Sequence, residues 1–364
     1  MNPAFETTLA KIRGCLIGGA VGDALGAPIE FSSLEEIRER FGPEGLADYS
    51  PAYGAIGSIT DDTQMTLFTA EGITRAYMRM RSRGICNSTA IVAHAYQRWL
   101  HTQGERSGRP ERVLQSGWLV HVPELQHRRA PGDTCIKALR TGAVKALNSS
   151  KGCGGVMRVA PIGLFLHMGH GEVFRKGCES AAITHGHPTG YLTAGVLAEL
   201  IAGIVREGLS VEEALQRAMR YLDHEPDDVV ETRRALEAAR WLARRDGGVT
   251  PSPAVVESLG GGWVAEEALA IGVYCAMVAG DFPTGVLLAA NHSGDSDSTA
   301  SIAGSILGAL LGPDAIPRRW IEQLEVRDTL DRLCDDWEQL FTRKDIFKDG
   351  WSITGDWGVR YPPN

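Results

Sequence analysis

Apolar residues recur at helical spacing along most of this chain. Between positions 61 and 80, and again between 296 and 311, apolar side chains return every three or four residues, which predicts amphipathic helices. Further helices are predicted at about 87–101, 133–147, 171–183, 189–207, 211–222, 228–245, 263–279 and 326–342. Alternating strand patterns are scarce, and short extended pieces are expected only near 118–122 and 353–359. We therefore expect an all-α protein built as a compact orthogonal helical bundle.

Glycines recur every four residues in the first predicted helix, and the spacing returns in the segment 296–311. The positions are Gly14, Gly18, Gly22, Gly26, Gly304 and Gly308. A glycine inside a helix costs up to about 1 kcal/mol, so a repeated glycine face indicates close packing against another helix. Pro28 should end the first helix.

The length of 364 residues and the 43% hydrophobic content are ample for a buried core. Polar loops are expected at 101–110 and 247–262, but neither shows the composition shift of a domain boundary. We expect one domain over 1–364, with the chemical motifs within about 14–312. A helical tail over 313–364 should wrap onto it.

Charge and cysteine content exclude several classes of protein. The net charge is −8 and no concentrated basic run exists, which argues against nucleic-acid binding. Seven dispersed cysteines form no CxxC pair, so neither a zinc ribbon nor a disulfide framework is expected. The chain lacks a signal-peptide pattern, and the apolar run 14–29 is too short to cross a membrane. We expect a cytoplasmic protein that does not associate with membranes.

Two short acidic clusters precede predicted helices far apart in the sequence. One is Ser58-Ile59-Thr60-Asp61-Asp62-Thr63 and the other is Gly294-Asp295-Ser296-Asp297-Ser298-Thr299. Helix capping explains one acidic residue at each helix start, but not two. Carboxylate and hydroxyl oxygens are the ligands that Mg²⁺ and Mn²⁺ prefer, so the surplus acids indicate a metal site if the clusters meet.

Three further features each have a purely structural and a functional interpretation. The glycine-rich stretch Lys151–Arg158 has backbone N–H groups that could cradle a phosphate, although it lacks the GK[ST] ending of a P-loop. His185 belongs to a His-x-His pair that could bind a ligand or only fill a turn. Glu30 follows Pro28 on a loop, where it could serve as an acid–base group or be a solvated side chain.

Taken together, the motifs resemble the ADP-ribosylglycohydrolases, the family of the dinitrogenase-reductase-activating glycohydrolase and of the ADP-ribosylarginine and ADP-ribosylserine hydrolases. The matching segments are 14–26, Thr60–Thr63, Lys151–Arg158, Thr184–His185 and Gly294–Thr299. The resemblance implies an all-α fold around a central pair of divalent cations, Mg²⁺ or Mn²⁺.

By matching position, the resemblance also implies roles for individual residues. The implied metal ligands are Thr60, Asp61, Asp62, Asp295, Asp297 and Ser298, the last standing where relatives often have Thr. The implied contacts to the diphosphate and ribose come from Lys151, Gly152, Cys153, Gly154, Gly155, Val156 and Met157, with His185 near the phosphates. Cys153 stands where many relatives have Asn. Glu30 matches a glutamate that gates the site in serine-directed relatives.

The leading hypothesis is a metal-dependent hydrolase that removes ADP-ribose from modified protein arginine. Asp62 would take the proton of the attacking water, and Glu30 could protonate the leaving group. One alternative is a hydrolase of serine-linked or O-acetyl-ADP-ribose. Another is an immunity-type protein that also clamps an ADP-ribosylating toxin, for which the N-terminal arm 1–10 is a candidate segment.

Overall fold

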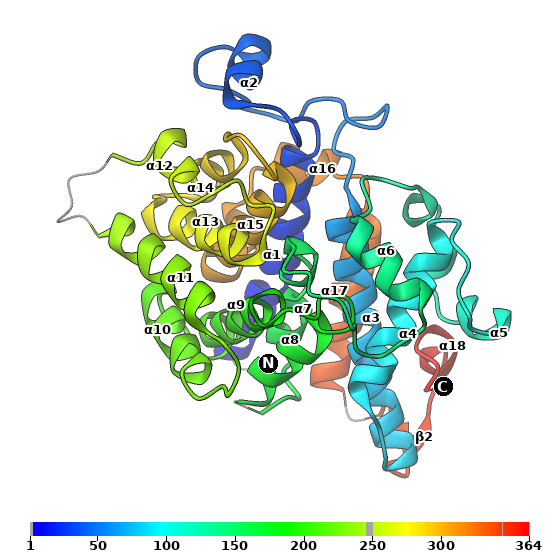
Figure 1. Ribbon diagram of the computed structural model, residues 1–364. Coiled ribbons are helices and arrows are strands. Elements are labelled where there is room, and N and C mark those ends of the chain that lie inside the picture. The colour runs from blue at the N-terminus through cyan, green and yellow to red at the C-terminus, as the bar shows by residue number, and fades with distance from the viewer. Residues whose placement is uncertain (1–2, 170, 245–249, 344, 364) are drawn as a thin grey trace.

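Helices dominate the computed structural model, which describes residues 3–169, 171–244, 250–343 and 345–363 (Figure 1). The longer helices are α1 Pro3–Gly26, α2 Leu34–Phe41, α3 Asp61–Arg83, α4 Ser88–Thr102, α6 Asp133–Arg140, α8 Glu172–Ala181, α9 Pro188–Glu207, α10 Val211–Leu222, α11 Val230–Ala243, α13 Ala265–Val278, α14 Phe282–Ala290, α15 Ser296–Leu311 and α17 Arg327–Thr342. The short helices are α5 Glu111–Leu114, η1 Leu119–His121, η2 Pro123–Gln126, η3 Cys153–Gly155, α7 Ala160–Leu164, α12 Pro253–Glu257, η5 Pro313–Ala315, α16 Arg318–Gln323 and α18 Trp357–Arg360. Within these ranges the one sheet is an antiparallel pair of β1 Phe347–Lys348 and β2 Ser352–Ile353, so the all-α prediction is confirmed.

Helix α1 runs through the middle of the molecule and packs along α15 (Figure 1). The glycine face predicted from the sequence makes this contact. A Cβ atom added to Gly18 would lie 2.4 Å from the Gly304 carbonyl oxygen, and one added to Gly304 would lie 2.1 Å from the Gly18 oxygen. Gly14 and Gly308 oppose each other in the same way. The two backbones are therefore in direct contact, an approach that side chains would prevent.

The remaining helices surround this central pair. Helix α15 also packs against α13 and α14, while α9 packs against α8, α10 and α7. Helix α2 projects from the body of the molecule, and only Ile37 of its residues is buried. The C-terminal segment returns through α17 to contact α1 and through β2 to contact α3.

Helix α9 is long and apolar enough to cross a membrane by length and composition. In this fold, however, 89% of its most apolar stretch is buried against other helices. Its hydrophobicity is therefore accounted for by its central position in the core.

Several predictions of local structure differ from the fold. The helix expected over 133–147 ends at Arg140, because Gly142 adopts a positive φ of 69°. The segment 118–122 forms a 3₁₀ turn rather than a strand, and most of 353–359 is turn and helix. The expected arm 1–10 is no free arm, since residues 3–10 form the first turns of α1. Residues 1–2, 245 and 247–249, which belong to the predicted arm, helix and loop, lie outside the described residues.

Candidate active site

The two acidic clusters meet beside the C-terminal end of α1. Thr60 caps α3, its hydroxyl accepting from the Asp62 N–H at 3.3 Å, so Asp61 and Asp62 occupy the first turn. Asp297 lies in the first turn of α15. A Cβ atom on Gly26 would lie 2.3 Å from the Asp297 Cα, so the absence of a side chain at Gly26 lets α15 begin against the end of α1.

The clusters line a cavity with a volume of 490 Å³. Eleven of the predicted site residues contribute to its wall: Glu30, Asp61, Asp62, Gly152, Cys153, Gly154, Met157, His185, Asp295, Asp297 and Ser298. The segment 130–135, Phe31 and Trp263 complete the lining. The structure thus brings to one cavity the four distant motifs that the family resemblance implied would share a site.

Carboxylate oxygens gather closely at one point of this wall. One oxygen each from Glu30, Asp295 and Asp297 lies within 4.8 Å of the other two. Asp61 and Asp62 line the same cavity from α3, where the Gly132 N–H donates to Asp61 Oδ2 at 3.2 Å. Glu30, expected as an acid–base group, thus lies beside two of the expected metal ligands.

The electrostatics of the cluster are unfavourable without a cation. Burial, followed by repulsion from neighbouring carboxylates, raises the pKa of Asp62 well above its ordinary value. Burial also raises the pKa values of Asp61 and Asp295, and it raises the pKa of Glu30 to about 10. Carboxylates this close cannot all ionise unless positive charge is supplied.

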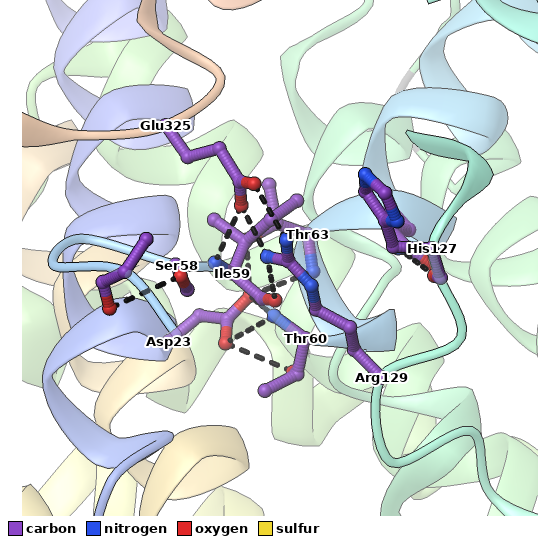
Figure 2. A network of polar contacts seen from close by, with 10 residues as sticks. Asp23, Ser58, Ile59, Thr60, Thr63, His127, Arg129 and Glu325 are labelled. Atoms are coloured by element: carbon purple, nitrogen blue, oxygen red, sulfur yellow. Dashed lines mark hydrogen bonds and ion pairs between the residues drawn. The ribbon is translucent and has the colours of Figure 1, made fainter. Parts of the chain in front are cut away.

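Asp23 ties α1 to the beginning of α3, as Figure 2 shows. Its carboxylate, fully buried, accepts from the Thr60 N–H at 3.0 and 3.1 Å and from the Thr60 hydroxyl at 2.9 Å. The Thr63 N–H and hydroxyl donate to Asp23 Oδ2 at 3.0 and 2.5 Å. Burial raises the pKa of Asp23 to about 7. No role for Asp23 was predicted. The sequence does contain a sign of one, because Asp23 is an acid within an apolar, glycine-rich helix.

An ion pair from distant segments holds the loop before α3. Arg129 pairs with Glu325 through its two terminal guanidinium nitrogens, Nη1 and Nη2, and Nη1 also donates to the Ile59 carbonyl oxygen at 3.2 Å (Figure 2). The backbone oxygen of Arg129 accepts from the Asp61 N–H at 3.2 Å. Sequence reasoning missed this pair, because nothing in the sequence relates residues 129 and 325.

The glycine-rich stretch forms another part of the cavity wall around the short helix η3. The Cys153 thiol donates to Asp295 Oδ2 at 2.8 Å, and the Ser298 hydroxyl lies 3.7 Å from the Cys153 sulfur. Burial, followed by the charge of Asp295, raises the pKa of Cys153 well above its ordinary value, so the thiol keeps its proton. Cys153 thus contacts the acidic cluster from the loop expected to bind phosphate.

Four predicted site residues do not line the cavity. The Thr60 hydroxyl is directed to Asp23, and Gly155 and Val156 lie buried behind the wall. Lys151 was expected to contact the diphosphate. Its ammonium instead donates to Glu266 at 2.5 Å and to Glu231 at 2.9 Å, joining the loop to α13 and α11.

Two aromatic rings stack at the cavity wall next to Glu30. The ring centroids of Phe31 and Trp263 are 5.2 Å apart with an interplanar angle of 19°. Phe31 is 70% exposed, adopts a positive φ of 70°, and directly follows Glu30. Neither ring was predicted as a site residue, because isolated aromatic residues in loops carry no distinguishing pattern.

An all-α fold with buried carboxylates at a cavity of this size defines a candidate hydrolase. Residues 5–346 match the family model for ADP-ribosylglycohydrolase, so the chain belongs to this family, which hydrolyses ADP-ribose from modified substrates.

Two curated relatives and one solved structure illustrate the similarity. An uncharacterized protein of Archaeoglobus fulgidus is 32% identical, over 92% of this chain and 97% of the relative. The ADP-ribosylarginine hydrolase Tri1 of Pseudomonas putida is 27% identical, over 93% of this chain and 80% of that protein. A solved structure of an ADP-ribosylglycohydrolase-related protein complex has a TM-score of 0.67 at 23% identity, over 92% and 99% of the two chains. That structure shows the shared fold.

The family depends on metal, and the donor set here fits a divalent cation. The wall offers hard oxygen donors at close spacing, which suits Mg²⁺ or Mn²⁺. Asp62 Oδ2 is buried and has no hydrogen-bond partner among the described residues. A buried anionic oxygen left unpaired is costly, and a bound cation would remove that cost.

Proposed function

We propose that this protein removes ADP-ribose from arginine side chains of modified proteins, with two divalent cations, Mg²⁺ or Mn²⁺, as cofactors. The observation that carries the proposal is the convergence of Glu30, Asp295 and Asp297 within 4.8 Å in a cavity that also contains Asp61 and Asp62. Such a site suits the hydrolysis of a sugar linkage, where positive charge develops on the ribose ring.

The cations would be held by Asp61, Asp62, Asp295 and Asp297, with Ser298 beside them. Bound there, they supply charge neutralisation and a more acidic water molecule. Asp62, whose carboxylate is buried at the cavity wall, is proposed as the general base that takes the proton of the attacking water.

Glu30 is proposed as the acid that protonates the leaving nitrogen. Its carboxyl group lines the cavity, and one of its oxygens lies within 4.8 Å of an oxygen each from Asp295 and Asp297, where a proton donor would face the bond to be cleaved. Its neighbour Phe31, stacked on Trp263, presents exposed ring faces beside it. Aromatic faces attract a guanidinium group, which favours an arginine linkage over a serine linkage.

The wall formed by Gly152, Cys153, Gly154 and His185 is proposed to receive the diphosphate. Among the described residues that line the cavity, none is lysine or arginine. Backbone N–H groups and the His185 ring are therefore proposed as the protein's donors to the phosphate oxygens.

The test is incubation of the full chain with arginine-, serine- and aspartate-linked ADP-ribose substrates, with and without EDTA. We expect release of ADP-ribose from the arginine linkage, loss of release in EDTA, and recovery on adding Mg²⁺ or Mn²⁺. Cleavage of the serine linkage alone would refute the arginine assignment. Full activity in EDTA would refute the metal assignment.

A further inference from the structure

Arg158 is a buried cation without a carboxylate partner. Its side chain is fully buried, and none of the ion pairs within the described residues includes it, although its charge opposes the rise in the pKa of the Asp61 carboxyl group. The guanidinium lies 4.3 Å from the centre of the Tyr96 ring, and one of its nitrogens lies 3.3 Å from the sulfur of Cys135. Burying a charge that no carboxylate contacts is costly, so its hydrogen bonds must offset that cost.

The closest of those contacts is to the hydroxyl of Thr184. Arg158 Nη2 lies 2.7 Å from Thr184 Oγ1, and the same oxygen lies 2.8 Å from His185 Nδ1. A guanidinium has donors only, so the threonine oxygen must accept from Arg158. The single proton of the hydroxyl therefore remains available for another partner.

Two acceptors compete for that proton, His185 Nδ1 and the Ala181 carbonyl oxygen at 3.4 Å. The Ala181 oxygen already accepts from the Thr184 and His185 N–H groups, both at 3.0 Å. A carbonyl oxygen has two lone pairs, so it has little capacity left for a third, longer bond. The proton thus goes to His185 Nδ1, and the neutral ring must carry its own proton on Nε2.

That second nitrogen faces the glycine-rich wall of the cavity. Cβ atoms placed on Gly152 and Gly154 would each lie 3.4 Å from His185 Nε2. Burial, followed by the charge of Arg158, lowers the pKa of His185 to about 3, so the ring is neutral near pH 7. A neutral ring presents a hydrogen-bond donor there only in the Nε2–H form.

We propose that Arg158 is a positioning residue: acting through Thr184, it fixes His185 as the Nε2–H tautomer, which donates to an anionic oxygen of the substrate at the Gly152–Gly154 wall. The identity of that anion as the diphosphate of ADP-ribose rests on the proposed function. The tautomer itself does not depend on which substrate binds.

The direct test is a long-range ¹H–¹⁵N spectrum of the full chain labelled with ¹⁵N-histidine, without ligand, at pH 7. The His185 signals are assigned by their loss in His185→Asn. We expect the shift of an unprotonated nitrogen for Nδ1 and of a protonated nitrogen for Nε2. A proton found on Nδ1 would overturn the proposal.

Thr184→Val removes the hydroxyl at nearly constant volume, and Thr184→Ser retains it as the matched control. In the valine variant we expect a mixed or reversed tautomer and about tenfold weaker binding of ADP-ribose by calorimetry. The serine variant should match the wild type in both measurements. A valine variant with unchanged tautomer and affinity would also overturn the proposal.

The outcomes separate this proposal from the proposed function. If the wild type binds no ADP-ribose, the proposed function fails, while the ligand-free spectrum still decides the tautomer. If Thr184→Val does not fold, the wild-type spectrum still decides whether the proton lies on Nε2 or on Nδ1, and a proton on Nδ1 overturns the proposal.

Discussion

Gly22→Ala should destabilise the protein through the contact between α1 and α15. A Cβ atom at this position would lie 2.0 Å from the Ala300 carbonyl oxygen and 2.4 Å from its carbonyl carbon. Both atoms belong to the backbone of a buried helix, so no side-chain rotation can relieve the clash. The helices must separate by roughly 1 Å to restore an ordinary contact distance, which opens the close packing on either side.

Two effects of opposite sign determine how much Gly22→Ala changes the free energy of unfolding. Alanine is a better helix former than glycine by about 1 kcal/mol, which favours the variant. Overpacking costs typically ~1–3 kcal/mol, with larger values where backbone must move. Because the added Cβ atom clashes with the backbone of a 16-residue helix, we expect an overpacking cost at the upper end of that range. The net loss should be about 2 kcal/mol, or roughly 3 °C in Tm for a chain of this length.

Urea and thermal unfolding followed by circular dichroism measure this loss. Gly280→Ala is the matched control, because a Cβ atom there would meet nothing within 4 Å, and it should unfold like the wild type. A Gly22→Ala protein as stable as the wild type would refute the conclusion that direct backbone contact requires glycine at this position.

Three further outcomes are expected. Asp297→Asn should lower Mn²⁺ affinity at least ~10-fold in calorimetry and lower hydrolysis with it; unchanged turnover would remove Asp297 from the metal site. Lys151→Met should leave ADP-ribose affinity unchanged and cost under ~1 kcal/mol of stability, because the ammonium engages two glutamates; a large loss of affinity would restore its predicted phosphate role. Burial, followed by neighbouring arginines, lowers the pKa of His94 to about 4, below the value of about 6.5 in the unfolded chain. The neutral His94 ring therefore contributes to stability above about pH 6.5, and this contribution is lost as the pH falls toward 4. Urea titrations of His94→Gln between pH 7 and 4 should therefore show a shallower decline than the wild type, and an equal decline would contradict this account.

Local patterns in the sequence were sufficient for most of the fold. Helices α10 and α15 occur with the predicted bounds, because their apolar spacing and end signals are local. Uniformly apolar or very short elements such as α14 and α7 lack that spacing, so they were not predicted. The spacing of the glycines predicted that two helices pack closely. It did not predict which residue of the second helix lies opposite each glycine.

Residue chemistry also predicted much of the candidate site. Surplus acids at two helix starts indicated a metal site on condition that Asp61, Asp62, Asp295 and Asp297 meet, and these residues line one cavity. The side chain of Lys151 could not be placed in this way, since its two glutamate partners come from other helices. A pairing between segments distant in sequence leaves no local pattern.

What the sequence by itself determined is therefore the helical class, the glycine face of α1 and the set of acids available to a metal. Only the tertiary structure decided that Asp23 secures the start of α3, that Glu30 joins Asp295 and Asp297, and that Arg158 reaches His185 through Thr184. The physical reason is that helix formation depends on neighbours within a few residues, whereas hydrogen bonding and charge depend on which surfaces the packed helices bring together.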